Sequence, residues 1–238
     1  MAYRYQQSPS TKLENKLFEE VLPGLKWLKG RGPDPSVYII GDVLIDGVPK
    51  WSRNRLLRAV EDHDLTANLL THVHPPTQGA ALALQRQRGL EIRCGQADLN
   101  ALGSGDFAES LPAHWVNRVL TPVLKGPSVT KGVGVDEGAT VCDFVVVDAP
   151  GHSPGHVALW READRTLLVG DIVVSRGMWA GRRHKLQEPP TCLTRDPSQN
   201  RTSARKLALL EPRTVFFAHG EPETDGSRFT DFVMSLPD

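Results

Sequence analysis

The stretch Thr71–Ala80 reads THVHPPTQGA, and it joins a predicted buried strand to a predicted helix. The strand is ANLLTH, at residues 67–72, and the helical pattern that follows ends in a cap at Gly89. His72 and His74 are two residues apart, so in extended backbone both imidazoles project to the same side. Two imidazoles placed in this way can bind one metal ion, and a ligand from a neighbouring loop would complete the site. This stretch therefore predicts a strand-to-helix junction and half of a metal site.

Three more side chains that can bind metal also follow predicted buried strands. They are His152 in GHSPGH, Asp171 in VGD and His219 in AHG. The carboxyl ends of strands are where α/β folds usually assemble their sites. A single histidine in such a place is more often an ordinary core or surface residue. Several of them at successive strand ends make coincidence a poor explanation, so the sequence predicts a metal centre.

The composition of the chain narrows the class of protein. Its 238 residues are 39% hydrophobic, which is enough for one domain with a sizeable core. Lysine plus arginine and aspartate plus glutamate each total 28, and this balance argues against a nucleic-acid partner. No apolar run approaches the roughly 20 residues of a membrane-spanning helix, so we expect no membrane partner. Because no signal peptide is evident and the three cysteines form no CxxC pair, we expect a cytoplasmic protein.

Predicted strands and helices alternate along the rest of the chain, as in a mixed α/β fold. The predicted strands are a hairpin at 37–47, single strands at 90–94, 142–151 and 214–220, and a second hairpin at 156–174. The other predicted helices are 203–211 and 228–236. We expect a single domain over residues 1–238, with an N-terminal extension at 1–20 and a surface excursion near the site at 175–200.

Five motifs in register resemble the metallo-β-lactamase fold superfamily. The superfamily string THxHxDHxG aligns with Thr71, His72, His74 and Gly79. Its early strand-end aspartate, its GHTxGH step, its GD after a hydrophobic strand and its final HG correspond to Asp46, His152, Asp171 and His219. The resemblance implies an α/β fold of one kind, a four-layer αβ/βα sandwich of two mixed sheets flanked by helices, with the metal cleft between the sheets.

The resemblance also implies a role for each matching side chain. The metal ligands would be His72, His74, His152 and Asp171. Asp46 and His156 would support these ligands without binding the metal themselves. Asp171 and His219 would be the catalytic residues.

One departure from the superfamily pattern decides the expected number of metal ions. Where the superfamily has Asp-His after HxHx, this chain has Pro76 and Thr77. Proline has no side-chain donor and a neutral hydroxyl is a weak zinc ligand, so only Asp171 and His219 remain for a second ion. We therefore expect one zinc ion per chain, with iron as the alternative metal. We also expect the Thr77 hydroxyl to cap the helix that follows it.

The predicted activity is hydrolysis of an activated carbonyl, a thioester or an ester, by a hydroxide bound to a mononuclear zinc ion. Asp171 would orient the water or accept its proton, and His219 would act on the substrate or the leaving group. Two alternatives stay open. The same ligands could hold a single Fe(II) in a dioxygenase of the persulfide type. The chain could also be a degenerate superfamily member, such as a binding protein, a cyclase or a lyase, with no hydrolytic activity.

The surface excursion carries the remaining candidates for substrate binding. Trp179, Arg182 and Arg183 follow Asp171 closely in the chain. They could fold over the cleft and bind a small-molecule substrate through an anionic tail. The competing interpretation is an ordinary solvated loop. The residues predict no oligomeric state.

Overall fold

The computed structural model describes residues 17–175 and 185–237, which form two β-sheets with a shared core between them. The larger sheet has seven strands in the order β1-β2-β3-β4-β5-β6-β7. Their bounds are Glu19–Leu22 (β1), Leu25–Leu28 (β2), Val37–Ile40 (β3), Val43–Ile45 (β4), Ala67–Leu70 (β5), Glu91–Gly95 (β6) and Gly132–Val135 (β7). Strands β1 to β4 pair antiparallel, whereas β4 to β7 pair parallel, so this sheet is mixed.

The smaller sheet has five strands in the order β12-β11-β10-β9-β8. Their bounds are Thr140–Val141 (β8), Phe144–Asp148 (β9), Val157–Arg161 (β10), Thr166–Leu168 (β11) and Thr214–Phe216 (β12). Only β11 and β12 pair parallel, and the other neighbours are antiparallel. This sheet is therefore mixed as well, as predicted.

Strand β3 shows how the sequence builds the layers. Its four residues, VYII, are all buried. Val37 and Ile39 pack with the helices on the outer side of the larger sheet, whereas Tyr38 and Ile40 pack into the core between the sheets. Successive side chains of a strand point to opposite faces, so one unbroken apolar run contributes to two cores.

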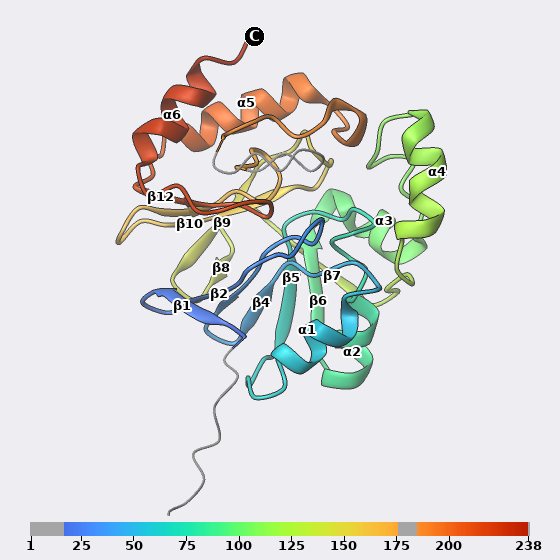
Figure 1. The fold of residues 1–238 in the computed structure, drawn as a ribbon. Coiled ribbons are helices and arrows are strands. Elements are labelled where there is room, and N and C mark those ends of the chain that lie inside the picture. Colours follow the sequence, from blue (N-terminus) through green and yellow to red (C-terminus); the bar gives the residue numbers. More distant parts are fainter. Residues whose placement is uncertain (1–16, 176–184, 238) are drawn as a thin grey trace, which may run out of the picture.

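Helices cover the outer face of each sheet (Figure 1). On the larger sheet these are α1 (Arg53–Ala59), α2 (Ala81–Arg88) and α3 (Leu99–Ser104); on the smaller sheet they are α5 (Pro197–Ala208) and α6 (Gly226–Met234). Helix α4 (Trp115–Leu124) stands at the edge of the sandwich. The order helix, sheet, sheet, helix confirms the predicted four-layer architecture. Within the described ranges, no helix has both the length and the apolar character needed to cross a bilayer.

The strands that carry the predicted site end at one edge of the sandwich. Strands β4 and β5 are parallel neighbours, so the residues after Ile45 and Leu70 lie side by side. Strands β9 and β11 both run antiparallel to β10, and β12 runs parallel to β11, so these three also point the same way. The loops after these strand ends carry Asp46, His72, His74, His152, Asp171 and His219.

Most of the predicted elements are present, with shorter bounds. The hairpin at 37–47 is β3 and β4, and the helix that ends before Gly89 is α2, with this glycine at φ 70°. The prediction that Thr77 caps α2 is wrong. Residues 75–80 form turns, the N-cap is Ala80, and no side chain caps the helix.

Two predicted boundaries differ from the structure. The expected N-terminal extension at 1–20 overlaps the fold, because Phe18 is buried and β1 begins at Glu19. The expected surface excursion at 175–200 overlaps α5, whose N-cap Asp196 accepts a hydrogen bond from Gln199 N. Aspartate followed by proline is a strong signal for the start of a helix. The polar residues around Asp196 and Pro197 nevertheless favoured the prediction of a surface loop.

Candidate metal centre

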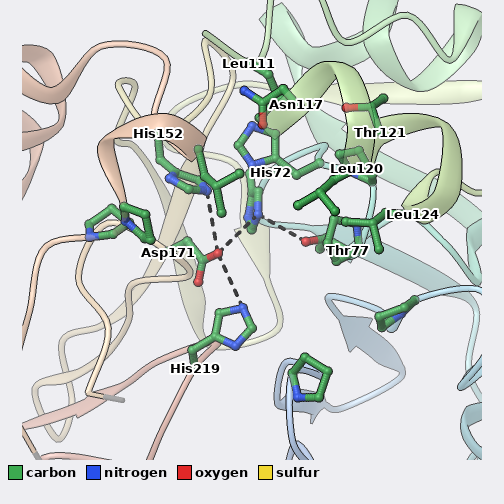
Figure 2. A pocket seen from close by; sticks show the side chains of 18 of the residues that line it. His72, Thr77, Leu111, Asn117, Leu120, Thr121, Leu124, His152, Asp171 and His219 are labelled. Atoms are coloured by element: carbon green, nitrogen blue, oxygen red, sulfur yellow. Dashed lines mark hydrogen bonds and ion pairs between the residues drawn. The ribbon is translucent and has the colours of Figure 1, made fainter. Parts of the chain in front are cut away.

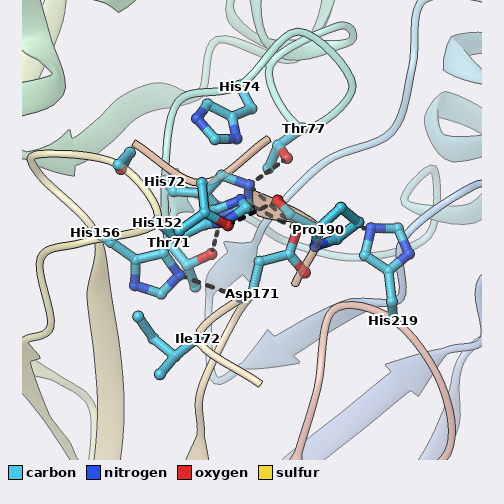
Figure 3. A network of polar contacts seen from close by, with 12 residues as sticks. Thr71, His72, His74, Thr77, His152, His156, Asp171, Ile172, Pro190 and His219 are labelled. Atoms are coloured by element: carbon cyan, nitrogen blue, oxygen red, sulfur yellow. Dashed lines mark hydrogen bonds and ion pairs between the residues drawn. The ribbon is translucent and has the colours of Figure 1, made fainter. Parts of the chain in front are cut away.

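Three buried imidazoles lie together where the strands end (Figure 3). His72 and His74 follow β5 of the larger sheet, and His152 follows β9 of the smaller sheet. One nitrogen of each ring lies within 4.8 Å of the other two, a spacing that one metal ion can bridge. The ring centroids are 4.5–5.0 Å apart, and no two of these three rings are stacked. The structure thus brings the three predicted histidines into one cluster, with ligands from both sheets.

A chain of hydrogen bonds orients His72. The Thr71 hydroxyl donates to Asp46 Oδ1 at 2.8 Å and lies 3.1 Å from His72 Nδ1. Because its hydrogen is given to Asp46, the Thr71 oxygen is free to accept from Nδ1–H. The lone pair of His72 is then on Nε2, which faces the cluster. Asp46 thus lies behind His72 and is linked to it through the Thr71 hydroxyl.

His74 and His152 are oriented in the same way by groups of the surrounding loops. His74 Nε2 lies 3.0 Å from Ser110 O, and a carbonyl can only accept, so the free lone pair is on Nδ1. His152 Nδ1 lies 3.3 Å from Thr194 Oγ1, whose own hydrogen is donated to Pro190 O. The lone pair of His152 is therefore on Nε2. Each ring presents one unprotonated nitrogen to the cluster.

The Asp171 carboxylate lies at the centre of the site (Figure 2). Its Oδ2 is 3.6 Å from His72 Nε2, 3.6 Å from His152 Nε2 and 3.7 Å from His219 Nε2. The side chain of His219 is 12% exposed, more than those of His72 and His152. The structure therefore brings both predicted catalytic residues to the three histidines.

This set of donors fits a transition-metal ion. Among the described residues, His152 Nε2 and Asp171 Oδ1 are buried and have no hydrogen-bond partner. Buried polar atoms are nearly always paired, so the unpaired His152 Nε2, which lies in the cluster 3.6 Å from Asp171 Oδ2, indicates a place for a cation. Imidazole nitrogens with a carboxylate are the ligand types of catalytic zinc and of non-haem iron.

The electrostatics of the site also favour a cation. Burial, with the neighbouring histidines, lowers the pKa of His72 and of His152 well below the ordinary value. Burial lowers the pKa of His74 to about 4. Burial raises the pKa of Asp171, and it raises the pKa of Asp46 to about 7. The histidines are therefore neutral near pH 7, which is the form of imidazole that binds metal.

The chain matches the family model of the metallo-beta-lactamase superfamily over residues 16–219. The chain belongs to this superfamily.

Individual relatives agree with this assignment. YflN of Bacillus subtilis (strain 168), described as a probable metallo-hydrolase, is 36% identical over 190 residues, covering 74% of this chain and 72% of that protein. A hydroxyacylglutathione hydrolase of Bdellovibrio bacteriovorus is 27% identical over 158 residues, covering 66% of this chain and 50% of that protein. A metallo-beta-lactamase family protein from Thermus thermophilus shares the fold, with a TM-score of 0.67 at 21% identity over 89% of this chain and 78% of that one. With the three-histidine cluster, these matches support a metal-dependent hydrolase.

His156 lies behind the three-histidine cluster, in contact with both His72 and the backbone of Asp171. Its Nε2 accepts a hydrogen bond from Asp171 N at 3.2 Å, and its ring stacks on His72 with centroids 5.2 Å apart. Gly170 directly precedes Asp171 and has no room for a side chain. A Cβ at this position would lie 2.7 Å from both His156 Nε2 and Thr71 Oγ1. This glycine also has φ 58°, so the glycine of the GD step is required by both space and conformation.

The positions where the superfamily pattern has Asp-His hold Pro76 and Thr77 in this member. Thr77 is buried, and its Oγ1 lies 3.1 Å from His72 Nε2. The hydroxyl that was expected to cap α2 therefore faces the metal cluster. Pro76 lines the pocket above the cluster and offers no donor. Asp171 and His219 remain as the ligand-type residues on that side of the site.

Asp98 connects two loops of the superfamily site, and the sequence reasoning missed it. Its carboxylate accepts from Val73 N at 2.9 Å, Ser153 Oγ at 2.6 Å and Gly155 N at 2.8 Å. It thereby ties the loop that holds His72 and His74 to the loop that holds His152. A signal was available, since Asp98 follows strand β6 as Asp171 follows β11. Ser110 acts through its backbone carbonyl, which leaves no sequence signal.

The three weaker predictions of substrate-binding residues fall outside the described part of the chain. Trp179, Arg182 and Arg183 belong to residues 176–184, which the structure does not describe. The pocket that the described residues line encloses about 250 Å³ directly above the three histidines. Its floor is the metal cluster, with Thr77 and His219.

Proposed function

We propose that this chain is a hydrolase of thioesters or esters that holds a single zinc ion on His72, His74 and His152 and keeps a position for water beside Asp171. The observation that supports one ion is the contrast between the two halves of the site. On one side, three imidazoles each present an oriented lone pair, and on the other side Pro76 and Thr77 offer no strong ligand. A zinc ion held there would act as a Lewis acid and lower the pKa of water towards about 7.

Other groups of the site would position the water and transfer the protons during hydrolysis. The Asp171 carboxylate lies within 4 Å of three ring nitrogens and can accept a proton from water beside the ligands. His219, the more accessible ring, lines the pocket and can donate a proton from Nε2 to the leaving group. The Thr77 hydroxyl is close enough to the cluster to hold the attacking water by a hydrogen bond. The apolar walls above the cluster exclude bulk water.

The names of relatives favour a thioester. Two of the relatives are described as hydroxyacylglutathione hydrolases, one from Bdellovibrio bacteriovorus and one from Haemophilus influenzae. The reaction in those names is hydrolysis of an activated carbonyl, which suits a site with one strong metal position. Each of them is less than 30% identical to this chain, so their names do not identify the acyl group or the thiol of its substrate.

Metal analysis with a substrate panel tests this proposal. Purified protein should contain about one zinc ion per chain by ICP-MS, and zinc-loaded protein should cleave thioesters or esters faster than β-lactams or phosphodiesters. His152→Ala should lose the metal, whereas His63→Gln should keep it, because the His63 ring packs on Phe18 and this residue precedes β5, at the opposite end of that strand from His72. Two fully occupied ions per chain, or an unchanged metal content in His152→Ala, would refute the single site on these ligands.

The same measurement decides between hydrolysis and the alternative chemistries. Three histidines with a carboxylate also suit a single Fe(II). Stoichiometric iron with persulfide-dependent oxygen uptake and no hydrolysis would move the assignment to a dioxygenase. A metal-free protein without activity would move it to a binding protein.

A further inference from the structure

We propose that the pocket above the three histidines binds an apolar acyl chain, so that the preferred substrate is an ester or thioester of a medium-chain or similarly apolar acid. This inference rests on the proposed hydrolase function and names the substrate class of the same site. The evidence for it is the set of side chains that form the pocket walls, which are separate from the candidate metal ligands.

Helix α4 forms one wall of the pocket. Leu120 and Leu124 are four residues apart, so they lie on one face of the helix, and both line the pocket with Leu111 (Figure 2). Val119 and Val123 lie on another face of the same helix and are 59% and 58% exposed. The helix therefore offers a leucine pair to the cavity and a valine pair to the outside. A substitution in the exposed valine pair can therefore serve as a control for the same substitution in the leucine pair.

A single side chain fixes this wall to the rest of the pocket. Asn117 is buried, and its amide donates to Pro112 O at 2.9 Å and to Cys192 O at 2.8 Å. The second of these bonds ties α4 to the turn that contains Leu193, which also lines the pocket. With both of its hydrogens used in this way, the Asn117 amide does not add a free donor to the cavity.

The opposite wall is rigid and apolar. Trp51 lines the pocket, and its indole nitrogen donates to Asp34 Oδ1 at 3.3 Å, which holds the ring in place although the residue is 51% exposed. Six of the lining residues are prolines, which have no amide hydrogen and little conformational freedom. A fixed aromatic ring and proline walls provide apolar contact area at a low entropy cost.

In the part of the chain that the structure describes, the pocket walls lack the groups that an anionic ligand would need. Among the described lining residues there is no lysine, arginine or glutamate, and the polar groups gather at the metal cluster and on one face of α4. A carboxylate placed against these walls would lose its water without gaining a partner. Methylene groups would gain, because each buried one strengthens binding by about fourfold. The cavity of about 250 Å³ is close to the lower end of small-molecule sites, roughly 300 Å³, and suits a single acyl chain of medium length or one ring.

Carboxylates of increasing length, which are the acids that acyl hydrolysis would release, test the proposal. Butanoate, hexanoate and octanoate are titrated calorimetrically into the zinc-loaded full-length protein, and hydrolysis of the matching p-nitrophenyl esters is measured in parallel. Affinity should rise with chain length, by about two- to fourfold per methylene group until the cavity is full. Leu120→Asn and Leu124→Asn should flatten this dependence, lowering octanoate binding about tenfold.

Val119→Asn is the matched control, since it makes the same change one residue away on the exposed face of α4. It should keep the chain-length dependence of the parent. An affinity that does not depend on chain length, or an equal flattening in Val119→Asn, would overturn the proposal. If octanoate binds as expected but no ester is cleaved, the proposed hydrolysis fails and the acyl pocket stands. If esters are cleaved at rates that ignore chain length, the acyl pocket fails and the hydrolysis stands.

Discussion

Each ring of the metal cluster offers one nitrogen because its other nitrogen is held by a particular neighbour. Thr71 holds His72, the Ser110 carbonyl holds His74, and Thr194 holds His152. Such partners fix both the tautomer and the orientation of a ligand before the metal arrives. The consequences of changing single residues follow from this arrangement.

Asp46→Asn should weaken zinc binding by about 10- to 100-fold, because an amide at this position disturbs the hydrogen bond that directs Thr71 towards His72. The substitution keeps the backbone, since Asp46 has φ 64° and asparagine tolerates this region well. Competition against a chromophoric chelator measures the affinity. Asp42→Asn, which changes an exposed acceptor for Thr66 Oγ1, should bind zinc as the parent does. Equal loss in both variants would contradict this role of Asp46.

Replacing Pro76 by Asp and Thr77 by His should create a second metal position. Asp171 Oδ2 and His219 Nε2 already lie 3.7 Å apart, and Thr77 already faces the cluster. Because Thr77 does not cap α2, its replacement costs the helix no cap. ICP-MS of the zinc-loaded double variant should give about two ions per chain against one in the parent, and Pro76→Asp alone should give fewer than two. A double variant with the metal content of the parent would show that the cleft differs beyond these two residues.

Among the elements, the short turn before α3 (Leu99–Ser104) contacts both loops that carry the clustered histidines. Asp98 precedes this helix, but its carboxylate forms no cap and points inward to the two ligand loops. The turn therefore connects the seven-stranded sheet to the loop after β9, and burial raises the pKa of this carboxyl. Its three accepted hydrogen bonds offset the cost of burying it.

Asp98→Asn should lower the free energy of unfolding by about 2 kcal/mol, because an amide places a donor against Val73 N or Gly155 N. Urea denaturation of the metal-free protein measures this loss, and zinc affinity should fall as the two loops separate. Asp106→Asn is the comparison, since that exposed carboxylate accepts from Ala108 N at 3.0 Å. Similar losses at both positions would show that Asp98 is an ordinary acceptor.

The sequence predicted the strands that lie in apolar runs and missed those that do not. The apolar runs of β3, β5, β9 and β10 were identifiable, as were the two C-terminal helices. Strands β1 (EEVL) and β2 (LKWL) include charged residues, β7 reads GVGV and β8 has two residues, so period and propensity could not distinguish them from loops. Helix α4 contains Pro122, which argues against a helix on local grounds. It forms because its leucines pack at the pocket and Asn117 anchors it.

The candidate ligands could be found from the sequence because they follow strand ends, whereas their partners could not. Thr77 shows the limit: its position before a helix favours a cap, and only the fold reveals that its hydroxyl reaches His72. Contacts such as Thr194 with His152 join residues far apart in the chain, and nothing local marks them.

At the scale of the whole molecule, folding buries several neutral histidines away from solvent. Burial lowers the pKa of His156 to about 3, below its ordinary value of about 6.5 in an unfolded chain. The unfolded chain therefore takes up a proton at this residue as the pH falls through 6.5, and the folded protein does not. The contribution of a neutral His156 to stability is present above this pH and is lost below it.

In the metal-free protein, the stability difference between the parent and His156→Gln should shrink by about 2 kcal/mol between about pH 7 and pH 5. The glutamine variant takes up no proton at this position. Acid therefore stabilises the unfolded state of the parent more than the unfolded state of the variant. Urea denaturation of both proteins at each pH gives the difference, and it should stay constant between about pH 8 and pH 7. A difference that is the same at pH 5 and pH 7 would contradict the lowered pKa of His156.

Because the ligands come from both sheets, the order in which the chain is made limits when the ion can bind. His72 and His74 emerge from the ribosome long before His152 and Asp171, and an ion that joins His72 to His152 closes a loop of 80 residues (152 − 72). A chain synthesised only as far as β9 contains two of the three clustered histidines, too few for a stable site. Metal loading is therefore a late event, and the ion cross-links an assembled sandwich.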